Sequence, residues 1–211
     1  MKKFLKFVGG MIVALLVVGF LVGRDDRGGP SSPSITAATA TPPAPEPPSA
    51  RERMASLMPT GQAAVVAAVE AARRRFDSAP NDMAKGAARP ARARAICAAL
   101  RSPLVAGWAG IVSKLDTNGE GKGVLEVEIG PDAYVKTWNN SLSDIGDNTL
   151  IEPSSTLFTA ASQLREGQLV RFDGTFFRDS TDCVRESSMS LSGSIREPEF
   201  IFRFLSISRI E

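Results

Sequence analysis

The stretch LEVEI, residues 125–129, alternates apolar and acidic side chains without interruption. Such alternation predicts a β-strand, because successive side chains of a strand point to opposite faces of a sheet. We expect Leu125, Val127 and Ile129 to lie on the buried face and Glu126 and Glu128 on the other. The kind of sheet that this strand joins is indicated by the segments on either side of it.

Further alternating segments flank this strand, and turn residues separate them. Asp116-Thr117-Asn118-Gly119 predicts the turn before it, and Gly130-Pro131 ends it. The polar stretch 139–148 predicts a loop, and Pro153-Ser154-Ser155 predicts the start of a helix over Thr156–Leu164. The predicted strands, in chain order, are Trp108–Leu115, Val124–Ile129, Ala133–Trp138, Gln168–Phe177, Glu186–Ile195 and Glu199–Ile210, with a short extended piece at Thr149–Ile151.

Three strands, a helix and then more strands is the element order of an oligonucleotide/oligosaccharide-binding (OB) barrel. The run Leu164-x-x-Gly167-x-x-Val170-x-Phe172-x-Gly174 resembles the entry to the strand that follows the helix in that fold. The chain departs from it by one additional strand near the C-terminus. The resemblance implies an α+β protein with a five- or six-stranded OB-like antiparallel β-barrel over residues 107–211. It implies little about function, because this fold hosts many unrelated activities.

The N-terminus predicts a membrane anchor over residues 1–27. Seventeen uncharged residues, Phe7–Gly23, follow a basic head that contains Lys2, Lys3 and Lys6. A helix of that length spans about 25 Å, near the lower limit for crossing a bilayer. The basic head predicts a cytoplasmic N-terminus, which places the body outside the inner (cytoplasmic) membrane, in the periplasm or an equivalent space. A cleaved signal peptide, cut near Gly23, is the alternative and gives the body the same location.

Residues 28–50 predict a disordered linker. They hold seven of the fourteen prolines of the chain, and nearly all other positions there are Ser, Thr or Ala. Such a segment buries too little apolar surface to offset its ordering entropy, so we expect an extended spacer.

Residues 51–106 predict a helical segment that packs on the barrel. A helix capped by Thr60 and running to Arg75 would carry an apolar stripe of Val65, Val69, Ala72 and Phe76. A second helix is expected from Asp82 to Arg101, interrupted at Pro90. The segment has few large apolar residues, which indicates that it docks on the barrel instead of folding alone.

The charge of the chain is divided between these parts. Residues 51–106 carry ten basic and four acidic side chains, whereas residues 107–211 carry ten basic and sixteen acidic ones. An acidic barrel makes nucleic acid an unfavourable partner, because binding would bring repulsion instead of counterion release. The basic helices either pair with the barrel or bind anionic lipid or another polyanion.

The composition restricts the available chemistry. The chain has no histidine, so Ser-His-Asp and Cys-His catalysis and the commonest transition-metal ligand are excluded. We expect no cofactor and no metal. The run from Asp116 to Gly121 imitates the start of a calcium loop, but Val127 stands where a glutamate is required, which favours a hairpin turn. Two cysteines, Cys97 and Cys183, predict a disulfide in an oxidising compartment, and two buried thiols are the alternative.

The predicted loop after the third strand is the best candidate site. An aromatic side chain beside amides and carboxylates can stack on a sugar or hold a cation. Phe200, Phe202 and Phe204 recur with period two and are interpreted as core residues. The candidate ligand-binding residues are Trp138, Asn139, Asn140, Asp144, Asp147 and Asn148.

These observations favour a membrane-anchored, non-enzymatic binding module that recognises an envelope component, either a protein or a glycan. Binding of nucleic acid or anionic lipid through the basic helical segment is one alternative. An enzyme that uses carboxylates near Asp144 and Asp147 is the other.

Overall fold

The computed structural model describes residues 47–211. The predicted anchor, residues 1–27, and the predicted linker up to residue 46 lie outside the described residues. Within residues 47–211, no helix combines the length and apolar character needed to cross a bilayer. At the end of the predicted linker, Ser49 caps the first helix, α1 (Ala50–Leu57), by accepting a hydrogen bond from the backbone N–H of Glu52.

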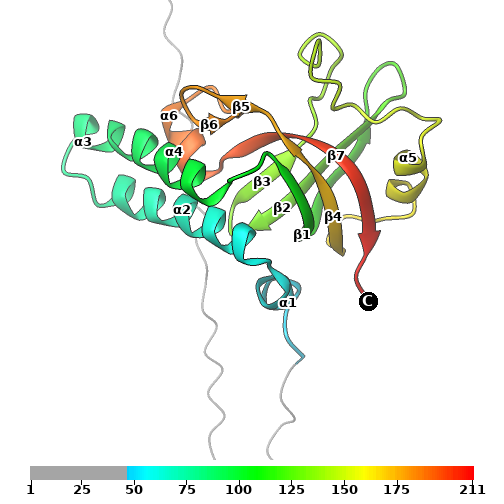
Figure 1. Cartoon of the computed structure of the whole chain (residues 1–211), viewed down its shortest axis with the longest axis horizontal. Helices are drawn as coiled ribbons and strands as arrows, with labels where there is room; N and C mark the ends of the chain where they lie inside the picture. Colours follow the sequence, from blue (N-terminus) through cyan, green and yellow to red (C-terminus); the bar gives the residue numbers. More distant parts are fainter. Residues whose placement is uncertain (1–46) are drawn as a thin grey trace, which may run out of the picture. The chain divides into compact units, whose positions relative to one another are not determined.

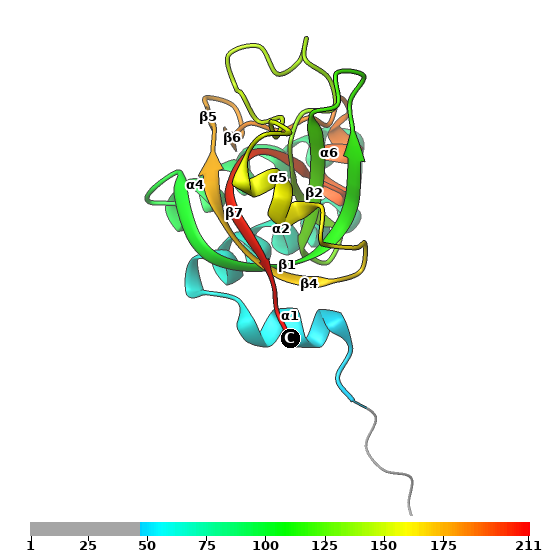
Figure 2. The ribbon, with the colours of Figure 1, turned by 90° about the vertical axis from the view of Figure 1, so that its right-hand side faces the viewer.

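Five strands close into a β-barrel (Figures 1 and 2). They are β1 (Leu104–Thr117), β2 (Gly123–Gly130), β3 (Ala133–Lys136), β4 (Leu169–Phe176) and β7 (Glu199–Arg209). Around the barrel their order is β1-β2-β3-β7-β4, and β1 pairs with both β2 and β4. All pairs are antiparallel except β3 with β7. The predicted inward face of β2 is confirmed, since Leu125, Val127 and Ile129 are all fully buried. The opposite face is covered as well, because α1 packs on β2 and the buried Glu128 pairs there with Arg51.

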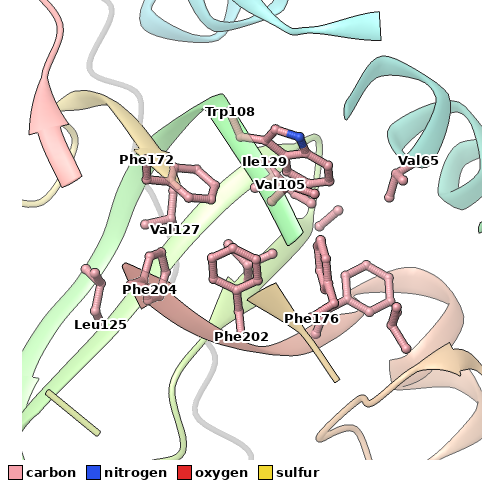
Figure 3. Packing of buried hydrophobic residues seen from close by; sticks show 14 of the residues in the cluster. Val65, Val105, Trp108, Leu125, Val127, Ile129, Phe172, Phe176, Phe202 and Phe204 are labelled. Carbon is pink, nitrogen blue, oxygen red and sulfur yellow. The ribbon is translucent and has the colours of Figure 1, made fainter. Parts of the chain in front are cut away.

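Aromatic rings fill the barrel (Figure 3). The ring of Phe202 lies edge-to-face against Phe176 and Phe204, with centroid distances of 4.9 Å in both pairs. Trp108 adds a further edge-to-face contact with Phe176 at 5.4 Å. The prediction that the phenylalanines of β7 belong to the core is therefore confirmed.

Two glycines let the strands approach these rings. A Cβ atom on Gly174 would overlap the ring of Phe202 and the carbonyl oxygen of Arg203, and one on Gly110 would overlap Val127. The register of β4 against β7 shifts beside Gly174, where the barrel wall bends. Such a bulge at a glycine is a common way to curve a strand into a closed barrel.

The helix α5 (Thr156–Ala161) lies between β3 and β4 in the chain and packs against β7. Figure 2 shows it across one opening of the barrel. Ser155 caps this helix by accepting a hydrogen bond from the backbone N–H of Phe158, at 3.1 Å. The predicted helix is thus present, and it ends before the predicted Leu164.

The predicted strand 186–195 is wrong. This region instead follows a short hairpin of β5 (Arg178–Asp179) and β6 (Cys183–Val184) and includes the helix α6 (Leu191–Arg196). Ser190 starts α6 by accepting a hydrogen bond from the backbone N–H of Gly193, at 3.0 Å. The alternation that suggested a strand depended on Met189, which is fully exposed. The barrel therefore has five strands and not six.

Within residues 47–211, four helices precede the barrel: α1, α2 (Thr60–Asp77), α3 (Asp82–Gly86) and α4 (Ala88–Ala99). The apolar stripe predicted for α2 is confirmed, since all four of its residues are buried. Two details differ from the expectation. Pro59, and not Thr60, is the N-cap residue of α2, and Pro90 lies in the first turn of α4, where its missing N–H needs no helical partner. The helical interruption falls at Ala87 instead.

The helical segment is joined to the barrel through apolar, polar and covalent contacts. The buried amide of Gln62 in α2 donates to the carbonyl oxygens of Ala109 and Ile129 and accepts from the N–H of Ala109. The predicted disulfide is confirmed, and it links Cys97 of α4 to Cys183 of β6. α1 packs on β1 and β2, and α2 packs against α4 (Figure 1).

Gly174→Ala should lower the free energy of unfolding by about 3 kcal/mol, because the added methyl group overpacks the wall beside Phe202. Chemical denaturation measures this change. Gly119→Ala is the matched control, since no atom lies within 4 Å of its added Cβ, and it should change stability by no more than about 0.5 kcal/mol. Equal effects of the two substitutions would contradict the proposed close approach.

Candidate functional site

The loop Asn139–Asn148 leaves β3 and projects from one end of the barrel, beside the turn between β1 and β2 (Figures 1 and 2). The side-chain amide of Asn118, in that turn, donates a hydrogen bond to Ser141 of the loop at 3.2 Å. Two separate segments therefore contact each other at this end of the barrel.

Asp144 organises the end of the loop. Its buried carboxylate accepts hydrogen bonds from the backbone N–H and the hydroxyl of Thr149, at 2.7 and 2.6 Å, and from the N–H of Leu150 at 3.1 Å. The same hydroxyl accepts a hydrogen bond from the N–H of Trp138 at 2.8 Å. Asp144 thus fixes the return of the chain, with both carboxylate oxygens directed to internal donors.

Asp147 connects the loop to the barrel. Its carboxylate accepts from the indole N–H of Trp138 at 2.8 Å and pairs with Arg185 at 2.5 Å. Its carbonyl oxygen accepts hydrogen bonds from the guanidinium of Arg203 in β7. Both arginines lie over the ring of Phe177, with distances of 5.6 and 5.3 Å to its centroid. The second candidate carboxylate is therefore also engaged internally.

The candidate amides are exposed. Asn139, Asn140 and Asn148 all lie at the surface, and the oxygen of the Asn140 side chain accepts a hydrogen bond from the N–H of Ser143 at 2.9 Å. Asn148 has a φ of 50°, a backbone conformation that asparagine tolerates better than most residues. Trp138 is half-buried, with its N–H directed to Asp147.

Sequence reasoning missed the most exposed apolar residues of this loop. Leu142 and Ile145 are 79% and 75% exposed. The available signal was the presence of two large aliphatic side chains in an otherwise polar loop. The loop is held in its first half by the hydrogen bond from Asn118 to Ser141 and in its second half by Asp144 and Asp147, so these side chains are presented on an ordered segment.

The calcium-like run forms a turn, as the sequence favoured. The side-chain oxygen of Asn118 accepts hydrogen bonds from the N–H groups of Glu120 and Lys122, and Gly121 adopts a φ of 78°. Across residues 47–211, no group of three acidic, histidine or cysteine side chains is placed to hold a metal ion.

A pocket of about 310 Å³ opens between the β1–β2 hairpin and α5. Apolar side chains such as Leu125, Ile151 and Phe158 line it, while Asp116, Thr117 and Ser162 are exposed at its edge. This lining suits the binding of an apolar group better than catalysis. A catalytic centre needs buried polar groups that converge on one point.

A cluster of charges is buried where α4 meets the β5–β6 hairpin and the segment after it. Arg92 has no exposed side-chain surface and contacts Asp182 at 3.2 Å and Glu186 at 2.5 Å, and Arg89 pairs with Asp182 at 2.6 Å. Another guanidinium nitrogen of Arg92 donates to the carbonyl oxygen of Ser194. Arg89 and Arg92 of α4 therefore help to dock the helical segment on the acidic side chains of Asp182 and Glu186.

The two acids of this cluster differ in their pKa. Burial removes Glu186 from water and raises its pKa above the ordinary value, despite the nearby Arg92. Burial also acts to raise the pKa of Asp182, but the hydrogen bonds and charges of Arg89 and Arg92 outweigh it, so the pKa of Asp182 is lowered. Perturbed acids can mark active sites, but here the exposed fractions of the Asp182 and Glu186 side chains are only 6% and 2%. The cluster is a docking contact that substrate does not reach.

Comparison with protein-family models and with curated proteins finds no match. The fold and the site define the chain as a closed five-stranded barrel with docked helices and an ordered, apolar-tipped loop at one end. Its function is therefore argued from this geometry.

Asp182→Asn should destabilise the fold by about 3 kcal/mol at pH 7, because it removes the buried carboxylate that pairs with both Arg92 and Arg89. The contribution of Asp182 is present above pH 3.8 and is lost as the pH falls through its lowered pKa. Denaturant unfolding between pH 3 and pH 7 measures both effects.

Glu186→Gln is the matched variant with the opposite pH dependence. Ionisation of Glu186 opposes folding, so the contribution of Glu186 to the stability of the fold is lost as the pH rises from 4.5 through its raised pKa. At pH 7 the free energy of unfolding of the variant should therefore lie within about 1 kcal/mol of that of the natural protein, since the amide still accepts a hydrogen bond from Arg92. A loss of stability in Glu186→Gln as large as that in Asp182→Asn would contradict the raised pKa of Glu186.

Asp144→Asn should loosen the loop. The N–H groups of Thr149 and Leu150 now donate to the two carboxylate oxygens of Asp144, and in the variant one of these oxygens becomes an amide nitrogen that cannot accept. We expect hydrogen exchange of residues 139–150 to accelerate at least tenfold, which corresponds to about 1.4 kcal/mol of local stability. Asn139→Ala, at an exposed neighbouring position, should leave exchange unchanged. Unchanged exchange in both variants would show that Asp144 does not organise the loop.

Proposed function

We propose that the chain is a membrane-tethered, non-enzymatic binding module of the cell envelope, and that the loop Asn139–Asn148 docks on a protein partner. Its barrel is proposed to be of the OB type. The strand order β1-β2-β3-β7-β4, the parallel pairing of β3 with β7 and the position of α5 between the third and fourth strands support this assignment. Because OB barrels host many functions, the functional proposal depends on the loop and not on the fold.

The exposed pair Leu142 and Ile145 is the observation that carries the proposal. Burying each of these side chains in a partner would contribute about 1.5–3 kcal/mol. Asp144 and Asp147 hold the loop by internal hydrogen bonds, so little conformational entropy would be lost on binding. An ordered loop that displays aliphatic side chains suits a protein surface with an apolar recess.

The same contacts weigh against the other candidate ligands. A glycan or cation site would need free carboxylates or a free indole N–H, but Asp144, Asp147 and Trp138 direct these groups to internal partners. Catalysis by the two carboxylates is unsupported for the same reason. Polyanion binding is disfavoured because Arg89 and Arg92 of the helical segment pair with buried acids.

The location is proposed from the N-terminal sequence. A basic head followed by Phe7–Gly23 suits a single span with the barrel on the outer side, and the proline-rich residues 28–46 suit a spacer. The disulfide between Cys97 and Cys183 is compatible with an oxidising compartment on that side.

Photo-crosslinking in intact cells tests the proposal. A photoreactive amino acid at position 142 or 145 should give one discrete protein adduct, which is lost when the remaining member of the pair is changed to Ser. Met83 and Met189 are matched control positions, because they are 91% and 103% exposed and lie outside the loop. A reactive group at either control position should give no such adduct.

Two outcomes would contradict the proposal. Adducts of equal yield at all four positions would show that exposure alone causes the reaction. Resistance of the barrel to a protease added outside the cytoplasmic membrane, together with digestion after lysis, would contradict the proposed location.

A further inference from the structure

We propose that the Cys97–Cys183 disulfide is a site of thiol–disulfide exchange, at which a thiolate from solution opens the bond while the protein stays folded. This inference is independent of the proposed partner-binding loop. It depends on the surroundings of the two cysteines, which differ in exposure and in the charge beside them.

The disulfide faces an open recess. A pocket of about 250 Å³ between α4 and the β5–β6 hairpin is lined by both cysteines together with Arg94, Ser180 and Thr181. Cys97 is exposed, whereas Cys183 is only 4% exposed. An incoming thiolate therefore has access to Cys97, and exposed disulfides are the ones that exchange readily.

The buried sulfur has a cation beside it. A guanidinium nitrogen of Arg178 lies 3.5 Å from Sγ of Cys183 and can donate to it. A positive charge next to a cysteine stabilises its thiolate, and a sulfur that forms a stable thiolate leaves faster in exchange. Arg178 therefore assigns Cys183 as the leaving group and Cys97 as the sulfur that is attacked.

The reaction balances with a thiol as its only co-reactant. The thiolate attacks Sγ of Cys97, a mixed disulfide forms there, and the electron pair of the broken bond goes to Sγ of Cys183. A second thiolate then attacks the mixed disulfide at the sulfur of the first thiol and releases Cys97. The protein has gained two electrons, and the external thiols have been oxidised to a disulfide.

Other contacts can hold the same elements together when this bond is open. Asp182, next to Cys183, pairs with Arg89 and Arg92 of α4, and Glu186 pairs with Arg92. These contacts make the covalent bond partly redundant, which reversible exchange requires and a purely structural disulfide does not.

Exposure of the purified full-length chain to thiols in native buffer tests the proposal. Glutathione in one arm and a thioredoxin-type dithiol protein in the other distinguish a small thiol from a protein source. After alkylation, peptide mapping should find the mixed disulfide on Cys97 and the alkyl group on Cys183, with an unchanged circular dichroism spectrum. Reaction in either arm supports exchange.

Variants of Arg178 separate the charge from its structural contact. Arg178 also donates to the carbonyl oxygen of Leu100, so Arg178→Lys keeps the charge while Arg178→Gln removes it. The glutamine variant should react about three- to tenfold more slowly than the lysine variant, and Arg75→Gln on α2 should react at the natural rate. Two results would overturn the proposal. One is a rate of reduction no higher than the rate of global unfolding, as measured by urea denaturation. The other is a mixed disulfide on Cys183.

Discussion

The structure depends on the closure of the barrel, in which β1 pairs on one side with β2 and on the other with β4. Closure brings the inward ring of Phe202 on β7 within edge-to-face distance of Phe172 and Phe176 on β4. It is sterically possible because Gly110 and Gly174 have no Cβ at the points where strands and rings are closest. Because a closed barrel has no free strand edge, function falls to the loops at its ends and to the surfaces where helices dock.

Opposite charges explain how the helical segment docks. The sequence showed a basic segment before an acidic one, which left external polyanion binding and internal pairing as alternatives. The structure uses several of these charges internally. Arg51 pairs with Glu128 on β2, and Arg92 pairs with Glu186. Arg73 donates to the backbone carbonyl oxygens of Pro131 and Asp132. A charge asymmetry along a sequence therefore need not indicate a charged ligand, since the two parts can neutralise each other on folding.

Periodic features were predictable from the sequence, and features that depend on side-chain direction in loops were not. The alternation around Val127, the phenylalanines of β7 and the apolar stripe of α2 each repeat often enough to define a face. The false strand at residues 186–195 depended on only three alternating positions, and the cap at Ser190 overrode it. In the loop, the sequence identified Asp144 and Asp147 as notable, but not whether their carboxylates face solvent or internal donors. That depends on contacts with Leu150 and Arg185, which only the fold brings close.

The segment Cys183–Glu186 connects the features on which both proposals depend. Cys183 carries the disulfide to α4, Arg185 pairs with Asp147 of the loop, and Glu186 contacts the buried Arg92. Four consecutive residues thus join the helical segment to the loop that displays Leu142 and Ile145. Adjacent residues of an extended chain point to opposite sides, so Arg185 can reach the loop while Glu186 reaches the helices. Cys183 does not follow this alternation, since its φ of 70° is not that of an extended residue. This short segment therefore contributes both to the order of the loop and to the docking of the helices, although its strand, β6, has only two residues.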